Sequence, residues 1–166
     1  MMSSEQIQVR FSPTTMDGAV LRGVAVPYES SSGDLRDMPE RGAYREIFQR
    51  GAFGKISDGV ALYVQHDPQQ IPLARVGSGT LRFTETNKGL EFEASISPTR
   101  ADLIDALKRG DLAGASIGFR TLSEKWIRTA SPPLRRVVKG KLVELSIVVE
   151  PAYAQARITE VTDGSN

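Results

Sequence analysis

The sequence predicts a mostly β fold of the α+β class, in which a barrel or sandwich of about seven strands carries two or three appended helices. Most of the chain consists of short segments that alternate polar and apolar residues, or that are apolar throughout, at lengths typical of strands. The few helix-like segments do not alternate regularly with them, so a parallel βαβ architecture is not indicated.

Turn signals separate the strand-like segments. Residues 60–64 are almost continuously apolar, which is typical of a buried strand. Asn-Lys-Gly at 87–89 lies between two alternating runs and predicts a β-hairpin. Lys139 and Gly140 predict a turn inside the last long apolar region. The strand-like segments are 6–11, 20–26, 60–64, 80–86, 89–97, 115–122, 134–150 and 156–161.

Two segments have helical patterns. Residues 40–50 place three apolar side chains on one helical face and are followed by Gly51. Residues 99–109 form the clearest predicted helix, because Thr99 can act as N-cap and the apolar residues share one face. Gly110 is expected to end this helix.

We expect a single domain over residues 1–166, with its core at about 20–160. A chain of this length can bury roughly 70% of its unfolded surface, so it needs no covalent or metal cross-links. Small polar residues predict a flexible loop at 30–38, and residues 162–166 are expected to form a loose tail.

Composition limits the chemistry and the partners. The chain has no cysteine and one histidine, which excludes thiolate nucleophiles and multi-histidine metal sites, and we expect no cofactor. A net charge of +1 lacks the positive field of a nucleic-acid binder. No apolar run approaches the roughly 20 residues of a membrane span, and no signal peptide is visible. We therefore expect a soluble protein with no nucleic-acid or membrane partner.

A serine between small residues is the first candidate for catalysis. Residues 114–118 match the G-x-S-x-G pattern of the α/β-hydrolases, in which the catalytic histidine follows the serine. Here the only histidine, His66, precedes Ser116, so that fold is excluded. The small neighbours of Ser116 nevertheless allow the close backbone approach that stabilises an oxyanion.

A histidine and a glutamate complete the candidate site. A serine hydroxyl needs a base, and His66 is the only imidazole that can serve as one. Glu144 lies in the apolar run 142–149, where a buried carboxylate requires a partner. A Glu144 that orients His66 would give a Ser–His–Glu arrangement by the logic of the serine-protease triad.

Each of these residues also has a simpler interpretation when it is taken alone. His66 can be a solvated histidine at the end of a strand. Ser116 can be a packing or turn serine. Glu144 can pair with Arg135 or Arg136 for structural reasons.

Five segments in register resemble the tailed-phage prohead proteases, the capsid-maturation serine proteases whose fold is similar to that of the herpesvirus assemblins. The segments are RGAF at 50–53, YVQHD at 63–67, KGLEFEA at 88–94, LKRGDLAGASIGF at 107–119 and LVELSIVVEPAY at 142–153. The resemblance runs from about 23 to 158, in the family's order.

The resemblance implies an assemblin-like β-barrel, closed or orthogonally packed, with His66, Ser116 and Glu144 as catalytic residues. The chain departs from the family at Gln65, where asparagine is common, and at Ile117, where an aromatic residue is frequent. The assemblins use a second histidine as third member, which this chain lacks. The third member is therefore a carboxylate, or there is none.

The resemblance implies a serine endopeptidase that cleaves capsid and scaffold proteins, and itself, inside the immature procapsid in the host cytoplasm. It is also compatible with a homodimer. Two other interpretations stay open. A catalytically inactive scaffold or assembly module would keep the same fold and partners, whereas a ligand-binding β-barrel would have a large apolar cavity and no contact between Ser116 and His66.

Overall fold

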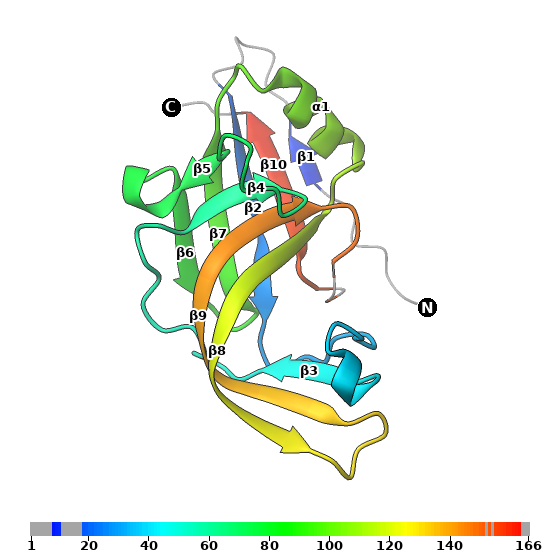
Figure 1. Ribbon diagram of the computed structural model, residues 1–166. Coiled ribbons are helices and arrows are strands. Elements are labelled where there is room, and N and C mark those ends of the chain that lie inside the picture. Colours follow the sequence, from blue (N-terminus) through cyan, green and yellow to red (C-terminus); the bar gives the residue numbers. More distant parts are fainter. Residues whose placement is uncertain (1–7, 11–17, 152, 154, 164–166) are drawn as a thin grey trace.

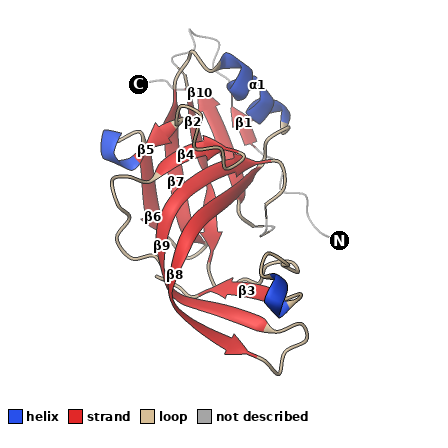
Figure 2. Ribbon diagram, viewed as in Figure 1, coloured by secondary structure: helices blue, strands red, loops and turns tan. Residues whose placement is uncertain are grey.

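The computed structural model describes residues 8–10, 18–151, 153 and 155–163, and shows a mostly β protein built on one nearly closed, barrel-shaped sheet (Figures 1 and 2). The main path of the sheet runs β5-β4-β9-β8-β10-β2-β7-β6, while β1 pairs with β10 and β3 with β9. The strands are β1 (Gln8–Arg10), β2 (Ala19–Pro27), β3 (Arg45–Phe48), β4 (Ala61–Val64), β5 (Ala74–Arg75), β6 (Leu81–Glu85), β7 (Gly89–Ile96), β8 (Gly114–Ile127), β9 (Leu134–Val148) and β10 (Arg157–Asp163).

The predicted mostly β class is confirmed, although the element count differs from the expected seven strands and two or three helices. The described residues contain ten strands, one α-helix and two 3-10 turns, Pro39–Arg41 and Val76–Ser78. No helix in this part of the chain has the length and apolar character needed to cross a membrane. The predicted hairpin is confirmed by the antiparallel pairing of β6 and β7.

The backbones of β2 and β10 approach each other closely where these two strands pair. A side-chain Cβ on Gly23, in the middle of β2, would lie 2.2 Å from the carbonyl oxygen of Arg157. The register of the two strands shifts between Ile158 and Glu160, as at a β-bulge. Glycine and bulge together allow the close approach and sharp bend of a barrel wall.

The helix predicted at 40–50 is wrong, because residues 45–48 form β3, which pairs in parallel with β9, and the only helical turn among the described residues nearby is the 3-10 turn at 39–41. Tyr44, Glu46 and Phe48 are all buried and alternate with more exposed neighbours, which is the period of a strand. Tyr44 and Phe48 also have helical spacing, and the acidic residue between them conceals the alternation. Glu46 is buried because it contacts Arg135 of β9.

The turn predicted at Lys139 and Gly140 is also wrong, because β9 continues through both residues. A Cβ on Gly140 would lie 3.0 Å from the ring of Phe53, so this glycine permits close packing on a strand instead of a reversal of the chain. Strands β8 and β9 consequently form a long hairpin that extends beyond the barrel and pairs there with β3 (Figure 1).

Helix α1 (Ala101–Arg109) confirms the clearest helical prediction, and Gly110 ends it in the left-handed conformation. Its N-terminus differs, because Arg100 precedes the first turn without a side-chain cap and the Thr99 hydroxyl instead contacts Ser97. The apolar face of α1 contributes Leu103, Ile104 and Leu107 to the core.

The core fills the barrel and holds the strands that carry the candidate site. Fully buried leucine and isoleucine side chains come from six strands and from α1, and each contributes about 1.5–3 kcal/mol by burial. The loop predicted at 30–38 contains Ser32, which is buried and accepts a hydrogen bond from the Glu46 amide at 2.9 Å. Of the tail predicted at 162–166, residues 162–163 belong to β10 and 164–166 lie outside the described residues.

Candidate active site

Three neighbouring strands carry the candidate site. Strand β9 lies between β4, which is parallel to it, and β8, which is antiparallel. Ser116 of β8 is opposite Ser146 of β9, and Gly118 is opposite Glu144. His66 lies two residues beyond the end of β4. Because neighbouring strands in a sheet are about 4.8 Å apart, this register brings short side chains of three segments within contact distance.

A left-handed turn directs His66 back over the sheet. Gln65 and His66 have φ values of 53° and 56°, which non-glycine residues adopt at a cost of about 1–3 kcal/mol and chiefly at functional sites. Hydrogen bonds hold this turn to β9: the Gln65 amide donates to the Ile147 carbonyl at 2.9 Å, and the His66 amide donates to the Ser146 hydroxyl at 3.2 Å. The Gln65 side chain in turn accepts from the Val149 amide at 3.1 Å.

The imidazole of His66 contacts both other candidate residues. Its Nε2 lies 2.9 Å from the Ser116 hydroxyl oxygen, and its Nδ1 hydrogen-bonds Oε1 of Glu144. Since a carboxylate only accepts, the proton of a neutral His66 is on Nδ1, and Nε2 is left to accept from the serine hydroxyl. A base for Ser116 needs this tautomer.

The side chains of the candidate site differ in how far they are buried. The His66 side chain is 41% exposed, whereas that of Glu144 is 18% exposed. The fully buried Ser146 donates its hydroxyl to the other carboxylate oxygen of Glu144 at 2.8 Å. The carboxylate is thus fixed from inside the sheet, while the imidazole and the Ser116 hydroxyl are accessible from the surface.

Ser146 and Gly118 belong to the site, although neither was singled out from the sequence. A Cβ on Gly118 would lie 2.7 Å from Oε1 of Glu144, so only glycine leaves the carboxylate its place. The signal that could have found them is the strand period of two. Ser146 follows Glu144 by two residues, and Gly118 follows Ser116 by two, so each pair shares a face.

Two of the alternative interpretations disagree with the contacts in the structure. The pairing of Glu144 with an arginine is wrong, because Arg135 contacts Glu46 and Glu124, and Arg136 contacts Glu29. The contact between Ser116 and His66 is likewise the opposite of what a ligand-binding barrel predicts.

A hydroxyl, an imidazole and a carboxylate connected in this order are the arrangement by which serine hydrolases activate their nucleophile. Comparison with protein families matches residues 5–165 to the caudovirus prohead serine proteases. The chain belongs to this family of capsid-maturation proteases, which confirms the resemblance of the five sequence segments. No curated protein and no solved structure gave a significant match.

Proposed function

We propose that this chain is an endopeptidase that cleaves the capsid and scaffold proteins of a phage head, with Ser116 as nucleophile, His66 as general base and Glu144 as the group that orients His66. The hydrogen-bonded line from Ser116 through His66 to Glu144 is the observation that carries the proposal. Membership of the prohead protease family supports capsid proteins as substrates and the procapsid as the site of action. Self-cleavage and homodimer formation stay predictions.

Acylation would begin when the Ser116 oxygen attacks the carbonyl carbon of the scissile peptide bond and gives its proton to Nε2 of His66. The tetrahedral intermediate then collapses, the C–N bond breaks, and the imidazolium returns the proton to the leaving amine. A water molecule next attacks the acyl ester with His66 again as base, which releases the acid product and restores the serine hydroxyl. Base catalysis of this kind contributes typically 10²–10⁴-fold.

Glu144 would act by holding the imidazole and by stabilising its positive charge during each proton transfer. Its two oxygens accept from different partners, His66 and Ser146, so the carboxylate cannot rotate without losing one of them. In this role Glu144 never takes a proton itself.

Co-expression with the cognate capsid protein, read out by intact mass, tests the proposal. We expect the wild type to cleave, and Ser116→Ala and His66→Ala to lose cleavage to a similar extent because the residues act as a unit. Glu144→Gln should lose less. Ser123→Ala is the matched control, since Ser123 is an exposed serine on the same strand.

Cleavage that persists in Ser116→Ala would overturn the assignment of the nucleophile. A wild type that binds the capsid protein and leaves it intact would instead favour the inactive assembly module.

A further inference from the structure

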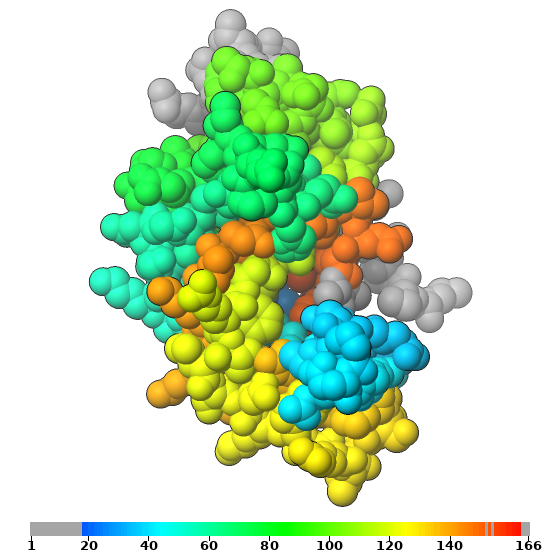
Figure 3. All heavy atoms as spheres, in the orientation of Figure 1, coloured from blue at the N-terminus to red at the C-terminus, as the bar shows by residue number. Residues whose placement is uncertain are grey.

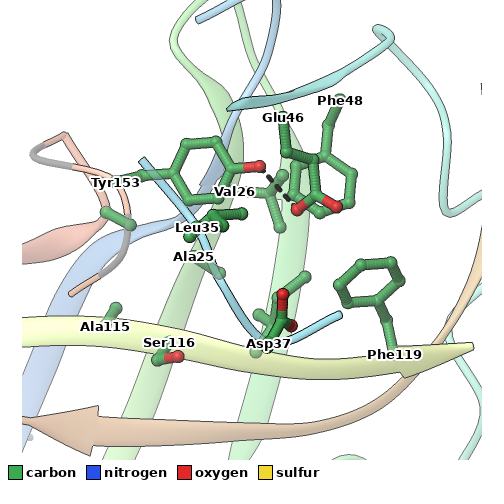
Figure 4. A pocket seen from close by; sticks show the side chains of 12 residues that line it. Ala25, Val26, Leu35, Asp37, Glu46, Phe48, Ala115, Ser116, Phe119 and Tyr153 are labelled. Carbon is green, nitrogen blue, oxygen red and sulfur yellow. Dashed lines mark hydrogen bonds between the residues drawn. The ribbon is translucent and has the colours of Figure 1, made fainter. Parts of the chain in front are cut away.

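A small pocket adjoins Ser116 on the inner side of β8 (Figure 4). Its volume is about 200 Å³, below the roughly 300–1,000 Å³ of pockets that hold drug-sized ligands, so it suits a single side chain. The space-filling view shows the surface hollowed between β8 and the segment around residues 35–45 (Figure 3). The pocket therefore borders Ser116, the residue whose hydroxyl would attack a substrate.

The edge of β8 next to this pocket is available to a substrate strand. The Ala115 amide donates to the Ala156 carbonyl at 2.9 Å, and β8 pairs with β10 only at Gly114. Because main-chain groups alternate in direction along a strand, Ile117 faces the same edge, where no described residue pairs with it. An extended peptide added here would bring one carbonyl to Ser116 and the side chain of that residue to the pocket.

Two carboxylates line the pocket, and the side-chain donors around them are already in use. Glu46 accepts from the Tyr153 hydroxyl at 2.8 Å and from the Arg135 guanidinium at 2.8 Å. Asp37 accepts from the hydroxyl of Tyr44. Burial and the nearby Glu46 raise the pKa of Tyr153, so its hydroxyl keeps its proton and stays a donor.

The pocket consequently offers acceptors, because each carboxylate has about four lone-pair positions and these contacts use only some of them. The charges of the side chains around the pocket also favour a cationic ligand. Arg135 is shared between Glu46 and Glu124, which leaves Asp37 without a guanidinium of its own in this cluster. Apolar groups such as Val26, Phe48 and Phe119 line the remaining wall.

We propose that this pocket is the primary specificity site of the protease and that it takes a lysine or arginine side chain from the residue whose carbonyl Ser116 attacks, here called the acyl-side residue. The inference rests on the proposed function, since it needs Ser116 as nucleophile. The aliphatic stem packs on the apolar wall, and the cationic tip donates to Glu46 and Asp37. An acidic side chain would be repelled by both carboxylates, and an apolar one would cover them without donating a hydrogen bond.

Labelling with phosphonates separates this proposal from the proposed function. A fluorophosphonate that lacks any recognition element should react with Ser116, forming an O–P bond as fluoride leaves, and should not react with Ser116→Ala. Three Ala-Ala peptidyl diphenyl phosphonates then differ only in the acyl-side residue: lysine, norleucine or glutamate. Norleucine has nearly the length of lysine without its charge. We expect the lysine probe to label Ser116 roughly tenfold faster than norleucine, and the glutamate probe to be slowest.

Failure of the fluorophosphonate to label Ser116 would overturn the proposed function. Labelling by the fluorophosphonate together with equal rates for lysine and norleucine, or with no reaction of the lysine probe, would overturn the specificity proposal alone.

Two variants assign the preference to the pocket. Asp37→Asn changes an exposed side chain and should reduce the lysine-to-norleucine ratio roughly threefold. Glu46→Gln should reduce the ratio further, and Asp37→Asn keeps the test valid if that buried variant does not fold. Asp34→Asn is the control, because Asp34 is an exposed carboxylate that pairs with Arg45 outside the pocket. Ratios that match the wild type in both pocket variants would contradict the proposal.

Discussion

Gly118 is the residue whose side-chain size most directly limits where the Glu144 carboxylate can lie. The two residues face each other across β8 and β9, and the position of a Cβ on Gly118 is 2.7 Å from Oε1 and 2.9 Å from Cγ of Glu144. The same oxygen contacts His66, so a displaced carboxylate would release the imidazole. The geometry of the candidate site therefore depends on the absence of a Cβ at Gly118.

Replacing Gly118 with alanine should therefore reduce activity more than stability. We expect Gly118→Ala to slow fluorophosphonate labelling of Ser116 by about 10²-fold, because a misplacement of about 1 Å has costs of this size. Gly33→Ala is the matched control, since a Cβ there meets no atom within 4 Å. Equal labelling rates for the two variants, with both proteins folded, would show that Glu144 does not need this space.

At the scale of elements, β3 is attached to the β8–β9 hairpin by a buried ion pair. Arg135 of β9 contacts Glu46 of β3 at 2.8 Å, and the two side chains are 8% and 5% exposed. Arg135 also donates to Glu124 of β8 at 2.6 Å, so a single guanidinium connects three strands. Tyr153 adds a hydroxyl to Glu46 at 2.8 Å from the loop before β10.

Removal of this guanidinium should destabilise the fold strongly, because it leaves the Glu46 carboxylate buried without its cation. We expect Arg135→Ala to lower the free energy of unfolding by about 3–5 kcal/mol. Arg45→Ala, which removes an exposed pair with Asp34, should lower it by about 0–1 kcal/mol. Urea denaturation measures both, and similar midpoints for the two variants would contradict a structural role for the buried pair.

The elements that the sequence predicted well are those whose periodicity no polar contact interrupts. The apolar run of β4, the hairpin of β6 and β7, and the amphipathic α1 were all found from their patterns. β3 was not, because Glu46 occupies a buried strand position that is made tolerable by Arg135 and Tyr153, 89 and 107 residues away in the chain. Long-range compensation of this kind has no local signature.

The candidate site could be predicted from the sequence for a different reason. A chain with one histidine and a carboxylate inside an apolar strand leaves few ways to activate a serine. The positions of Ser146 and Gly118 depend on the register of β8 against β9, which pairs residues 30 and 26 positions apart and is set by the whole sheet. The sequence therefore indicated the candidate catalytic groups but not the residues that position them.

The free energy of unfolding of the whole molecule should depend on pH through the Glu46 carboxyl. Burial raises the pKa of this carboxyl above 4.5, against the opposing effects of Tyr153 and Arg135. The folded protein therefore binds a proton that the unfolded chain has already lost, and this contribution to stability falls as the pH rises from about 4.5 through the raised pKa.

Glu46→Gln should remove that contribution. We expect the free energy of unfolding of the wild type, measured relative to this variant, to decrease as the pH rises across that interval. Chemical denaturation of both proteins at several pH values provides the measurement. A difference that instead grows with pH would mean that Arg135 and Tyr153 outweigh the effect of burial.

The central position of β9 also fixes the time at which the site can exist. His66 follows β4 and Ser116 lies on β8. These two strands do not pair with each other; both pair with β9, which comes later in the chain than either. On the ribosome, a nascent chain that has exposed the imidazole and the hydroxyl still lacks the strand that joins them and the carboxylate that it carries. Synthesis order thus delays the assembly of the candidate catalytic groups until residue 148 has emerged and the sheet has closed around it.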